Sequence, residues 1–564
     1  MIDGTPLHSA IAARGELLFL PLGGAGEIGM NLNLFGYNGQ WVMVDLGVTF
    51  GDDSQPSIDV IMPDPVFIAE RRDALLGIVL THAHEDHIGA VPHLWRRLGA
   101  PPIYCTPFTA SVLRRKLPEY GLARDVVIHE VPLSGEFGLG PFRFQMITLT
   151  HSIPEPNALA IHTPVGTVLH TGDWKFDPEP LVGQVTDFDT LKALGDKGIL
   201  ALVGDSTNVF KPGEAGSEAA VRASLTELIG QFNNRVAVAC FASNVARLES
   251  IVMAAAAHGR RVALVGRSLH RMVESARENG YLADLPPLVS EDEVGYLPPE
   301  EVLLLCTGSQ GEQRAALARI AANDHPHVVL EEGDAVIFSS RIIPGNEKSI
   351  GRLHDKLIKQ GIEVVTEQDH FIHVSGHPAR DELARMYALT RPKIAVPVHG
   401  ELRHLYEHAE LARECQVPTA IVVENGDVLR LAPGEPMVLD KVPTGRLAVD
   451  GSRLVPLGGA ELKQRLRMTY NGMAVATLVL DKRGNLQTDP VLTLHGLVDA
   501  EQDEAQILID KALDAIEDVV ETFAASGRGG EDTVLRDAVK AAVRRIVHSA
   551  IGLKPVTEVH LIRL

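Results

Sequence analysis

The stretch THAHEDHIG, residues 81–89, holds three histidines and two carboxylates within six consecutive positions, His82 to His87. It follows the apolar run Gly77 to Leu80, which predicts a buried strand. A strand that ends in such a loop presents several nitrogen and oxygen donors at one edge of a sheet. Because imidazole and carboxylate groups together suit zinc or a similar divalent ion, the stretch indicates a metal site. The other interpretation, a polar surface loop with chance histidines, is disfavoured by this density of donors.

More donors stand directly after predicted strands farther along the chain. His151, Asp173, Asp205 and His399 each follow an apolar run. Strand ends along one edge of a sheet converge, so we expect donors far apart in sequence to share an ion. Asp45 also ends an apolar run, and its carboxylate is expected to hydrogen-bond a ligand histidine without touching the metal. Taken alone, Asp45 and His399 also fit ordinary turn residues, and His151 also fits a histidine with a structural role.

These donors are too numerous for one tetrahedral zinc and suit two ions that share a carboxylate. We assign three histidines to the first ion, namely His82, His84 and His151. The second ion is expected to bind Asp86, His87 and His399. Asp173 would bridge the two ions, with a water or hydroxide in an open position between them. Such a pair of ions flanks the attacking and leaving oxygens of a phosphoryl displacement.

The composition excludes some classes of protein. The 564 residues predict several domains, and 45% hydrophobic residues suffice for large cores. The four cysteines are widely spaced without a CxxC pair, which disfavours a disulfide scaffold and fits the cytoplasm. We find no signal-like segment and no apolar run of about 18 residues, so no membrane partner is expected. The net charge of −21 counts against a simple nucleic-acid coat, but it is compatible with a local basic channel and bound cations.

Beyond about Lys211 the pattern changes to strands that alternate with helices. Four apolar runs, VAVACF, RVALVG, EVLLLC and DAVIFS, are each followed by a short polar loop and a helix-like stretch. This alternation predicts a parallel, doubly wound sheet whose loops open at its carboxyl edge. Basic side chains in or near those loops predict a local positive wall, although ordinary surface charges fit as well. They are Arg247, Arg267, His270, Arg271, Arg341 and Lys348.

The pattern of a strand followed by histidine returns after this region. HVSGH, residues 373–377, precedes a predicted strand that leads to His399. The simplest account is one domain that is interrupted by an insertion. The predicted boundaries are 1–208 and 368–440 for the two parts of that domain, 209–367 for the insertion, 441–468 for a linker and 469–564 for a small C-terminal α/β domain. The C-terminal domain shows no evident chemistry, so packing or self-association is its expected role.

The stretch THAHEDHIG resembles the signature of the metallo-β-lactamase fold, and the longer sequence is similar to the beta-CASP nucleases. Within these, GEIGMN, GDSTN, FASN, TGSQGE, SSRIIPGNE and HVSGH resemble motifs of the bacterial ribonuclease J family. The resemblance covers most of the chain. It implies a metallo-β-lactamase αββα sandwich with an inserted parallel-sheet beta-CASP domain and a small C-terminal α/β domain.

The same resemblance implies a ribonuclease with two zinc ions per chain, for which manganese or magnesium could substitute in vitro. Such enzymes degrade single-stranded RNA from 5′ to 3′, favour a 5′ monophosphate and also cut internally, in rRNA processing and mRNA decay. The family's metal ligands fall on the seven donors assigned above. Its catalytic residues fall on Asp86, Asp205, His373 and His377. Its substrate-binding residues fall on Ser243, Asn244, His373, Val374, Ser375, Gly376 and His377.

Two other classes of function stay open at this point. A beta-CASP DNA nuclease or another metallohydrolase would use the same centre, because no residue visibly recognises a 2′-hydroxyl. A non-catalytic RNA-binding scaffold also fits, although the full set of ligands argues against it. We further expect single-stranded RNA as the partner, a homodimer or homotetramer, and partner proteins of RNA decay. Which of Asp205, His373 and His377 transfers the proton is left open by the sequence.

Overall fold

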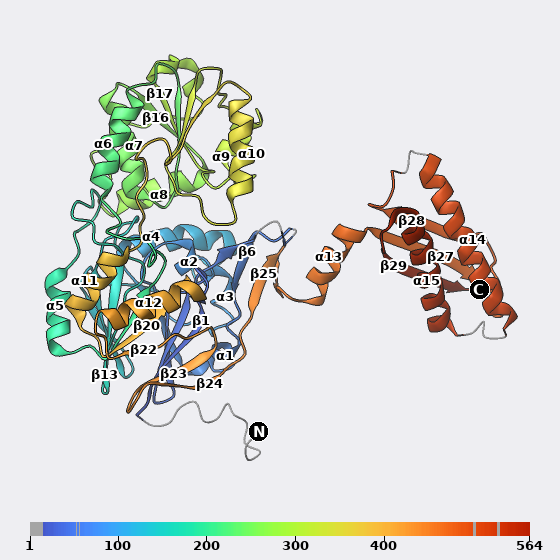
Figure 1. The fold of residues 1–564 in the computed structure, drawn as a ribbon, viewed down its shortest axis with the longest axis horizontal. Helices are drawn as coiled ribbons and strands as arrows, with labels where there is room; N and C mark the ends of the chain where they lie inside the picture. The colour runs from blue at the N-terminus through green and yellow to red at the C-terminus, as the bar shows by residue number, and fades with distance from the viewer. Residues whose placement is uncertain (1–14, 52–53, 56, 500–502, 527–530) are drawn as a thin grey trace. The chain divides into compact units, whose positions relative to one another are not determined.

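The computed structural model describes residues 15–51, 54–55, 57–499, 503–526 and 531–564 (Figure 1). The chain forms two compact units. The first runs from the first described residue to Phe50 and from Val60 to Leu447, and the second contains Gly51–Asp59 and Ala448–Leu564. Within the described ranges, no helix is long and apolar enough to cross a membrane.

Two β-sheets pack face to face at the centre of the first unit. They share one core, in which Phe19 and Phe35 of one sheet pack with Phe144, Val203 and Val396 of the other. The first sheet contains, in order, β24 (Met437–Lys441), β23 (Asp427–Ala432), β1 (Leu17–Gly23), β3 (Leu32–Tyr37), β4 (Gln40–Val44), β7 (Leu75–Val79), β8 (Ile103–Cys105) and β9 (Ile128–Glu130). The second contains β10 (Glu136–Leu139), β11 (Phe142–Thr148), β12 (Asn157–Thr163), β13 (Gly166–His170), β14 (Ala201–Asp205), β20 (Ile394–Val398) and β22 (Thr419–Ala420).

Helices cover the outer faces of this sandwich. Side chains alternate along β4, so that Val42 and Val44 enter the central core while Trp41 packs edge-on against Phe67, with 5.4 Å between ring centres. Phe67 belongs to α1 (Val66–Ala69). The outer face of the second sheet packs against α5 (Phe188–Lys197), α11 (Arg380–Thr390) and α12 (Leu402–Glu414). The predicted αββα sandwich is therefore confirmed.

Strand direction brings the predicted donors to one edge of the sandwich. The strands β13, β14 and β20 are parallel neighbours, so their carboxyl ends lie side by side. Asp173 follows the first of these strands, Asp205 ends the second and His399 follows the third. In the other sheet β4 and β7 are also parallel, which places Asp45 beside the loop at 81–89. Residues more than 300 positions apart in sequence therefore meet for topological reasons.

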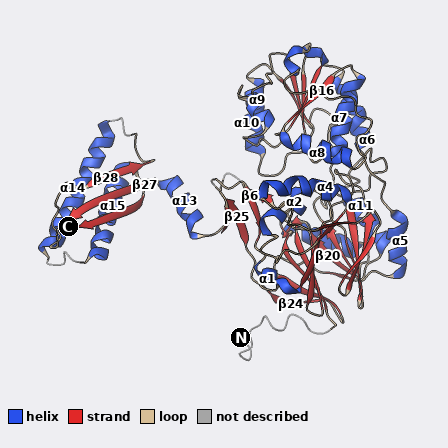
Figure 2. Ribbon diagram, turned by 180° about the vertical axis from the view of Figure 1, so that it is seen from behind, coloured by secondary structure: helices blue, strands red, loops and turns tan. Residues whose placement is uncertain are grey.

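A separate five-stranded sheet is inserted between β14 and β20. Its strands, in order, are β16 (Arg261–Val265), β17 (Val302–Cys306), β15 (Val236–Ala239), β18 (Ala335–Phe338) and β19 (Glu363–Val365). All neighbouring strands are parallel, as predicted. The helices are α6 (Glu218–Ile229), α7 (Val245–Ala257), α8 (Arg267–Glu278), α9 (Ala316–Ala321) and α10 (Glu347–Ile358). Figures 1 and 2 show α6 and α7 on one face of this sheet and α9 and α10 on the other.

The second unit contains a small α/β domain. Its sheet has the order β28 (Val491–His495), β27 (Met473–Leu480) and β29 (Val556–Arg563). Two helices, α14 (Asp503–Ala525) and α15 (Asp532–Ile551), pack on this sheet through Ile516, Val539 and Val543. The predicted linker at 441–468 instead contains β25 (Arg446–Asp450), β26 (Arg453–Pro456) and the start of α13 (Ala460–Asn471). Its charged residues pair with one another, since Arg465 binds both carboxylate oxygens of Asp450.

A buried ion pair joins the sandwich to the first helix of the insertion. Lys175 Nζ lies 2.8 Å from Asp177 Oδ2 and donates a hydrogen bond to the Gly216 carbonyl at 3.0 Å. The same carboxylate oxygen accepts the backbone amide of Glu218, the first residue of α6, at 3.0 Å. Burial by itself would raise the pKa of the Asp177 carboxyl, but the Lys175 ammonium outweighs burial and lowers this pKa.

We expect the parent protein to be more stable than Asp177→Asn, and the difference to be largest above about pH 4, the usual pKa of an aspartate. Because the folded-state pKa is lowered, the stabilising charge is present above the unfolded-state value and is lost as the pH falls through the folded-state value. Scanning calorimetry of both proteins across the acidic range measures the difference in unfolding temperature. A difference that grows on acidification would contradict the role of this ion pair.

Candidate metal centre

The loop at 81–89 contains the short helix α2 (Glu85–Ile88). This loop packs against the backbone that follows β4. The Leu46 amide donates to the His87 carbonyl at 2.7 Å. A Cβ atom added to Gly47 would lie 1.6 Å from the Asp86 carbonyl oxygen, so the two segments approach as closely as they do only because residue 47 is glycine. This contact fixes the cluster of donors at the edge of the sheet.

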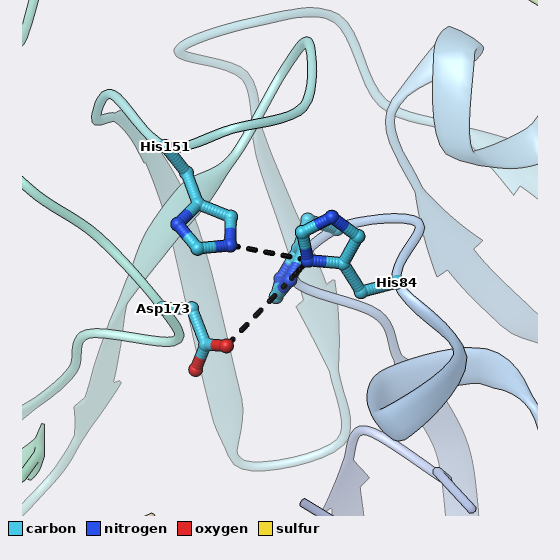
Figure 3. Close-up of side chains that lie close together, drawn as sticks. His84, His151 and Asp173 are labelled. Carbon is cyan, nitrogen blue, oxygen red and sulfur yellow. Dashed lines mark hydrogen bonds and ion pairs between the residues drawn. The ribbon is translucent and has the colours of Figure 1, made fainter. Parts of the chain in front are cut away.

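The first group of donors consists of His82, His84, His151 and Asp173, with one atom of each within 4.8 Å of the others. Nδ1 of His84 lies 3.1 Å from Nε2 of His82 and 3.1 Å from Nε2 of His151. Figure 3 shows His84, His151 and Asp173 pointing toward one another from separate loops. Burial lowers the pKa of His84 to about 4. Neutral imidazoles whose nitrogens converge in this way are suited to bind a divalent ion.

The second group consists of Asp86, His87, Asp173 and His399. Nε2 of His87 lies 3.1 Å from Asp173 Oδ2, and Nε2 of His399 lies 3.2 Å from Asp86 Oδ2. Burial opposes ionisation of Asp173, but the neighbouring His399 and His87 outweigh it and hold the pKa of this carboxyl well below its usual range. Asp173 belongs to both groups, so its carboxylate can bridge two ions.

Hydrogen bonds on the far side of the rings orient three of these histidines. Nδ1–H of His87 donates to Asp45 Oδ2 at 2.7 Å, and Nδ1–H of His399 donates to Thr207 Oγ1 at 3.0 Å. Nδ1–H of His151 donates to the Gly376 carbonyl. Each bond leaves the Nε2 lone pair of the ring facing the cluster, which is the tautomer that a metal requires.

Asp205 and His377 lie beside the second group and form, with Asp173 and His399, a third set of possible donors. Nδ1 of His377 is 2.8 Å from Asp205 Oδ2, and the other carboxylate oxygen accepts the Thr207 hydroxyl at 2.7 Å. Burial alone would lower the pKa of His377, but the Asp205 and Asp173 carboxylates outweigh it and raise this pKa. The pair can therefore hold a proton next to the cluster.

His373 lies in a different environment, although it belongs to the same HVSGH motif. Its Nδ1 is 3.5 Å from the Arg247 guanidinium. Burial, together with the charge of Arg247, lowers the pKa of His373 well below its usual value. Of the two histidines predicted to be catalytic, the structure thus places His377 against the Asp205 carboxylate and His373 against a cation.

The predicted substrate-binding residues form two neighbouring segments. The Ser375 hydroxyl accepts the Asn208 side-chain amide at 2.7 Å and the His377 backbone amide at 3.1 Å. Val374 is buried. The Asn244 side-chain oxygen caps α7 by accepting the Arg247 amide at 2.9 Å, and Ser243 before it is half-buried. The oxygen of Asn244 therefore caps the helix, and its Nδ2 group can donate to a ligand.

The expected positive wall needs one correction. Arg247 is fully buried, and one edge of its guanidinium binds Glu218, with Nε at 3.0 Å and Nη2 at 2.9 Å from the carboxylate. Its charge is neutralised inside the protein, so it does not face a ligand. Arg271 pairs with Glu119. Arg267, Arg341 and Lys348 remain exposed.

Several residues of the site were not predicted from the sequence. Thr207 connects His399 with Asp205, Asn208 holds Ser375, and the Asn31 side chain donates to the Asp86 carbonyl at 3.1 Å. All three lie within GEIGMN or GDSTN. The hydroxyl and amide side chains in these motifs indicate hydrogen bonding near the site, but only the folded chain shows which groups they bind.

Four family models match the chain. They are described as the metallo-beta-lactamase superfamily (residues 31–230), the ribonuclease J beta-CASP domain (233–357), a Zn-dependent metallo-hydrolase RNA specificity domain (361–422) and the ribonuclease J C-terminal domain (460–564).

Similar proteins span the full chain. The chain is 42% identical over 561 residues to a ribonuclease J of Sinorhizobium meliloti, which covers 99% of both proteins. It is 36% identical over 546 residues to a ribonuclease J of Mycobacterium tuberculosis, covering 95% of both. A crystal structure of an Enterococcus faecalis protein of unknown function matches with a TM-score of 0.51 and 19% identity, over 75% of this chain and 100% of the other. This last likeness concerns the fold alone.

We expect Asp45→Asn to weaken metal binding about 10- to 100-fold, because the amide cannot accept from His87 and Thr81 as the carboxylate does. Competition with a chromogenic chelator measures the affinity. The matched control is Asp125→Asn, which alters an exposed carboxylate paired with Arg96. Equal affinities for Asp45→Asn and the parent would show that Asp45 does not orient a ligand.

We expect Gly376→Ala to lower the metal content of the purified protein. The new Cβ would lie 2.7 Å from Cε1 and 2.8 Å from Nδ1 of His151, so the ring must move. Elemental analysis after dialysis measures the metal per chain. Gly351→Ala is the control, because Gly351 lies in α10 with open space around its Cβ position. Unchanged metal content in Gly376→Ala would mean that His151 is not a ligand.

Proposed function

Because the chain belongs to the ribonuclease J family of metal-dependent ribonucleases, we propose that it degrades single-stranded RNA from the 5′ end, prefers a 5′ monophosphate and also cuts internally. RNA is its substrate and its centre uses divalent metal. The observation that carries the proposal is the position of Asp173 in both donor groups. One carboxylate shared between two sets of histidines can hold two ions close together, as two-ion phosphodiester hydrolysis uses them.

The proposed ions are two zinc ions. His82, His84 and His151 would hold one, Asp86, His87 and His399 the other, and Asp173 would bridge them. When bound, the ions would lower the pKa of a water between them and stabilise charge on the phosphate oxygens. Asp45, Thr207 and the Gly376 carbonyl keep the ligand imidazoles in the required tautomer.

The residues around the centre are proposed to transfer the proton, bind the phosphate and contact the terminal nucleotide. We assign the proton on the leaving oxygen to His377, whose Nδ1–H is held by Asp205 so that Nε2 can face the substrate. Ser375 and the backbone of 375–377 would bind the phosphate, since the Asn208 side chain holds this segment in place. Ser243 and the amide of Asn244 would contact the terminal nucleotide. His373, paired with Arg247, would support the loop and not transfer the proton.

The C-terminal unit is proposed to assemble the enzyme into a homodimer or homotetramer. All groups of described residues that could hold a metal lie in the first unit. Val491, Ile562 and Leu564 are exposed apolar side chains of that unit. We further propose a cytoplasmic location and a role with other proteins in RNA processing and decay.

We expect the protein to release mononucleotides from end-labelled RNA with a 5′ monophosphate, more slowly from the same RNA with a 5′ triphosphate, and not at all after chelation. The double variant Asp86→Ala, His87→Ala should lose activity on the order of a thousandfold or more, because it removes ligands of the proposed second ion. Circular RNA reports internal cleavage separately, since it has no 5′ end.

The control variant is Arg96→Ala, which changes an exposed residue of the sandwich away from the centre. A DNA oligomer of the same sequence distinguishes a DNA nuclease. Degradation of the DNA at the rate of the RNA, or full activity in the double variant, would refute the proposed function.

A further inference from the structure

The buried Arg247 side chain stands at the junction between the insertion and the HVSGH motif. Its exposed fraction is 0%. Nη1 donates to the Ser339 carbonyl at 2.9 Å, to the Ser339 hydroxyl at 2.8 Å and to the Ile372 carbonyl at 3.0 Å. Ser339 directly follows β18 of the inserted sheet, and Ile372 directly precedes residues 373–377. One guanidinium therefore joins the inserted sheet to the start of the segment that carries His377.

The other side of Arg247 is connected to the sandwich. Glu218 binds it with both carboxylate oxygens and is itself 2% exposed. The backbone amide of Glu218 donates to Asp177, which is paired with Lys175. The backbone of Lys175 donates to the Thr150 carbonyl at 2.7 Å, next to His151. A continuous buried polar chain thus leads from the first donor group to Ile372.

We infer that Arg247 is a positioning residue for RNA binding, which fixes segment 373–377 through the Ile372 carbonyl. This inference rests on the proposed function, because it assumes that the segment binds the phosphate. Arg247 itself does not touch the substrate, since it is enclosed by protein on all sides. Its role would be to hold the backbone of Ser375 and Gly376 in the conformation that receives a phosphate.

The geometry requires arginine and not simply a positive charge. A planar guanidinium can bind the Glu218 carboxylate with two nitrogens and still direct Nη1 to both carbonyls. A lysine ammonium is a single point and would satisfy the carboxylate or the carbonyls, but not both. Ser339 supports the same contact, because its hydroxyl donates to the Ile372 carbonyl at 2.8 Å. Arg247→Lys and Ser339→Ala therefore loosen the segment to different degrees.

The experiment measures kcat and KM of Arg247→Lys, Ser339→Ala and the parent on matched RNA oligomers with a 5′ monophosphate or a 5′ hydroxyl. We expect KM of Arg247→Lys to rise about tenfold, while its kcat changes much less. We expect KM of Ser339→Ala to rise as well, by a smaller factor. Metal content should equal that of the parent. Hydrogen exchange should increase at the backbone amides of 373–377.

Arg222→Lys is the matched control, because Arg222 forms a partly exposed pair with Glu249 between the same two helices. It should leave kcat and KM unchanged. The inference is overturned if KM of both Arg247→Lys and Ser339→Ala equals that of the parent, or if kcat and metal content fall together with no change in KM. If the parent enzyme shows no 5′ preference, the proposed 5′ specificity is wrong. The inference about Arg247 is tested separately, by the ratio of KM between each variant and the parent.

Discussion

The carboxylate of Asp173 is the group on which the rest of the structure depends. It is buried, and its Oδ2 lies 3.9 Å from Nε2 of His82 and 3.1 Å from Nε2 of His87, which belong to different donor groups. A buried anion is stable only when cations or hydrogen-bonding groups lie close to it. The sandwich meets this requirement by ending several strands at one edge, where loops from both sheets supply imidazoles. The core of the sandwich therefore serves to hold these strand ends in register.

The insertion adds a second constraint to this edge. The chain leaves the sandwich after Asp205, forms a complete parallel sheet with its own core and returns before β20. On the way back it passes the donors again, so that His377 meets Asp205 and the Gly376 carbonyl meets His151. The segment proposed to bind phosphate is thus hydrogen-bonded directly to a proposed metal ligand. Buried ion pairs at Lys175 and Arg247 hold the two connecting segments together.

Charge counted along the sequence was a poor guide to this arrangement. The net charge of −21 says nothing about Arg247, whose charge is neutralised within the protein by Glu218. The six basic residues near the inserted loops looked equivalent in sequence, but their environments differ. Arg247 is buried, Arg271 forms an ion pair with Glu119 of the sandwich, and others are exposed. The predicted linker is a second example. Its charged residues suggested an unstructured segment, but Asp450 and Arg465 form an ion pair within it.

The sequence by itself predicted the candidate donors and their order, and it determined the fold class. Dense histidines after an apolar strand are a local pattern, and so are strands that alternate with helices, since both depend on residues close together in the chain. Tertiary structure alone decided that Thr207 orients His399, that His377 and not His373 meets Asp205, and that Arg247 is buried. These contacts join residues that are mostly more than 100 positions apart. They depend on strand order and on the path of the insertion, which periodicity and composition do not encode.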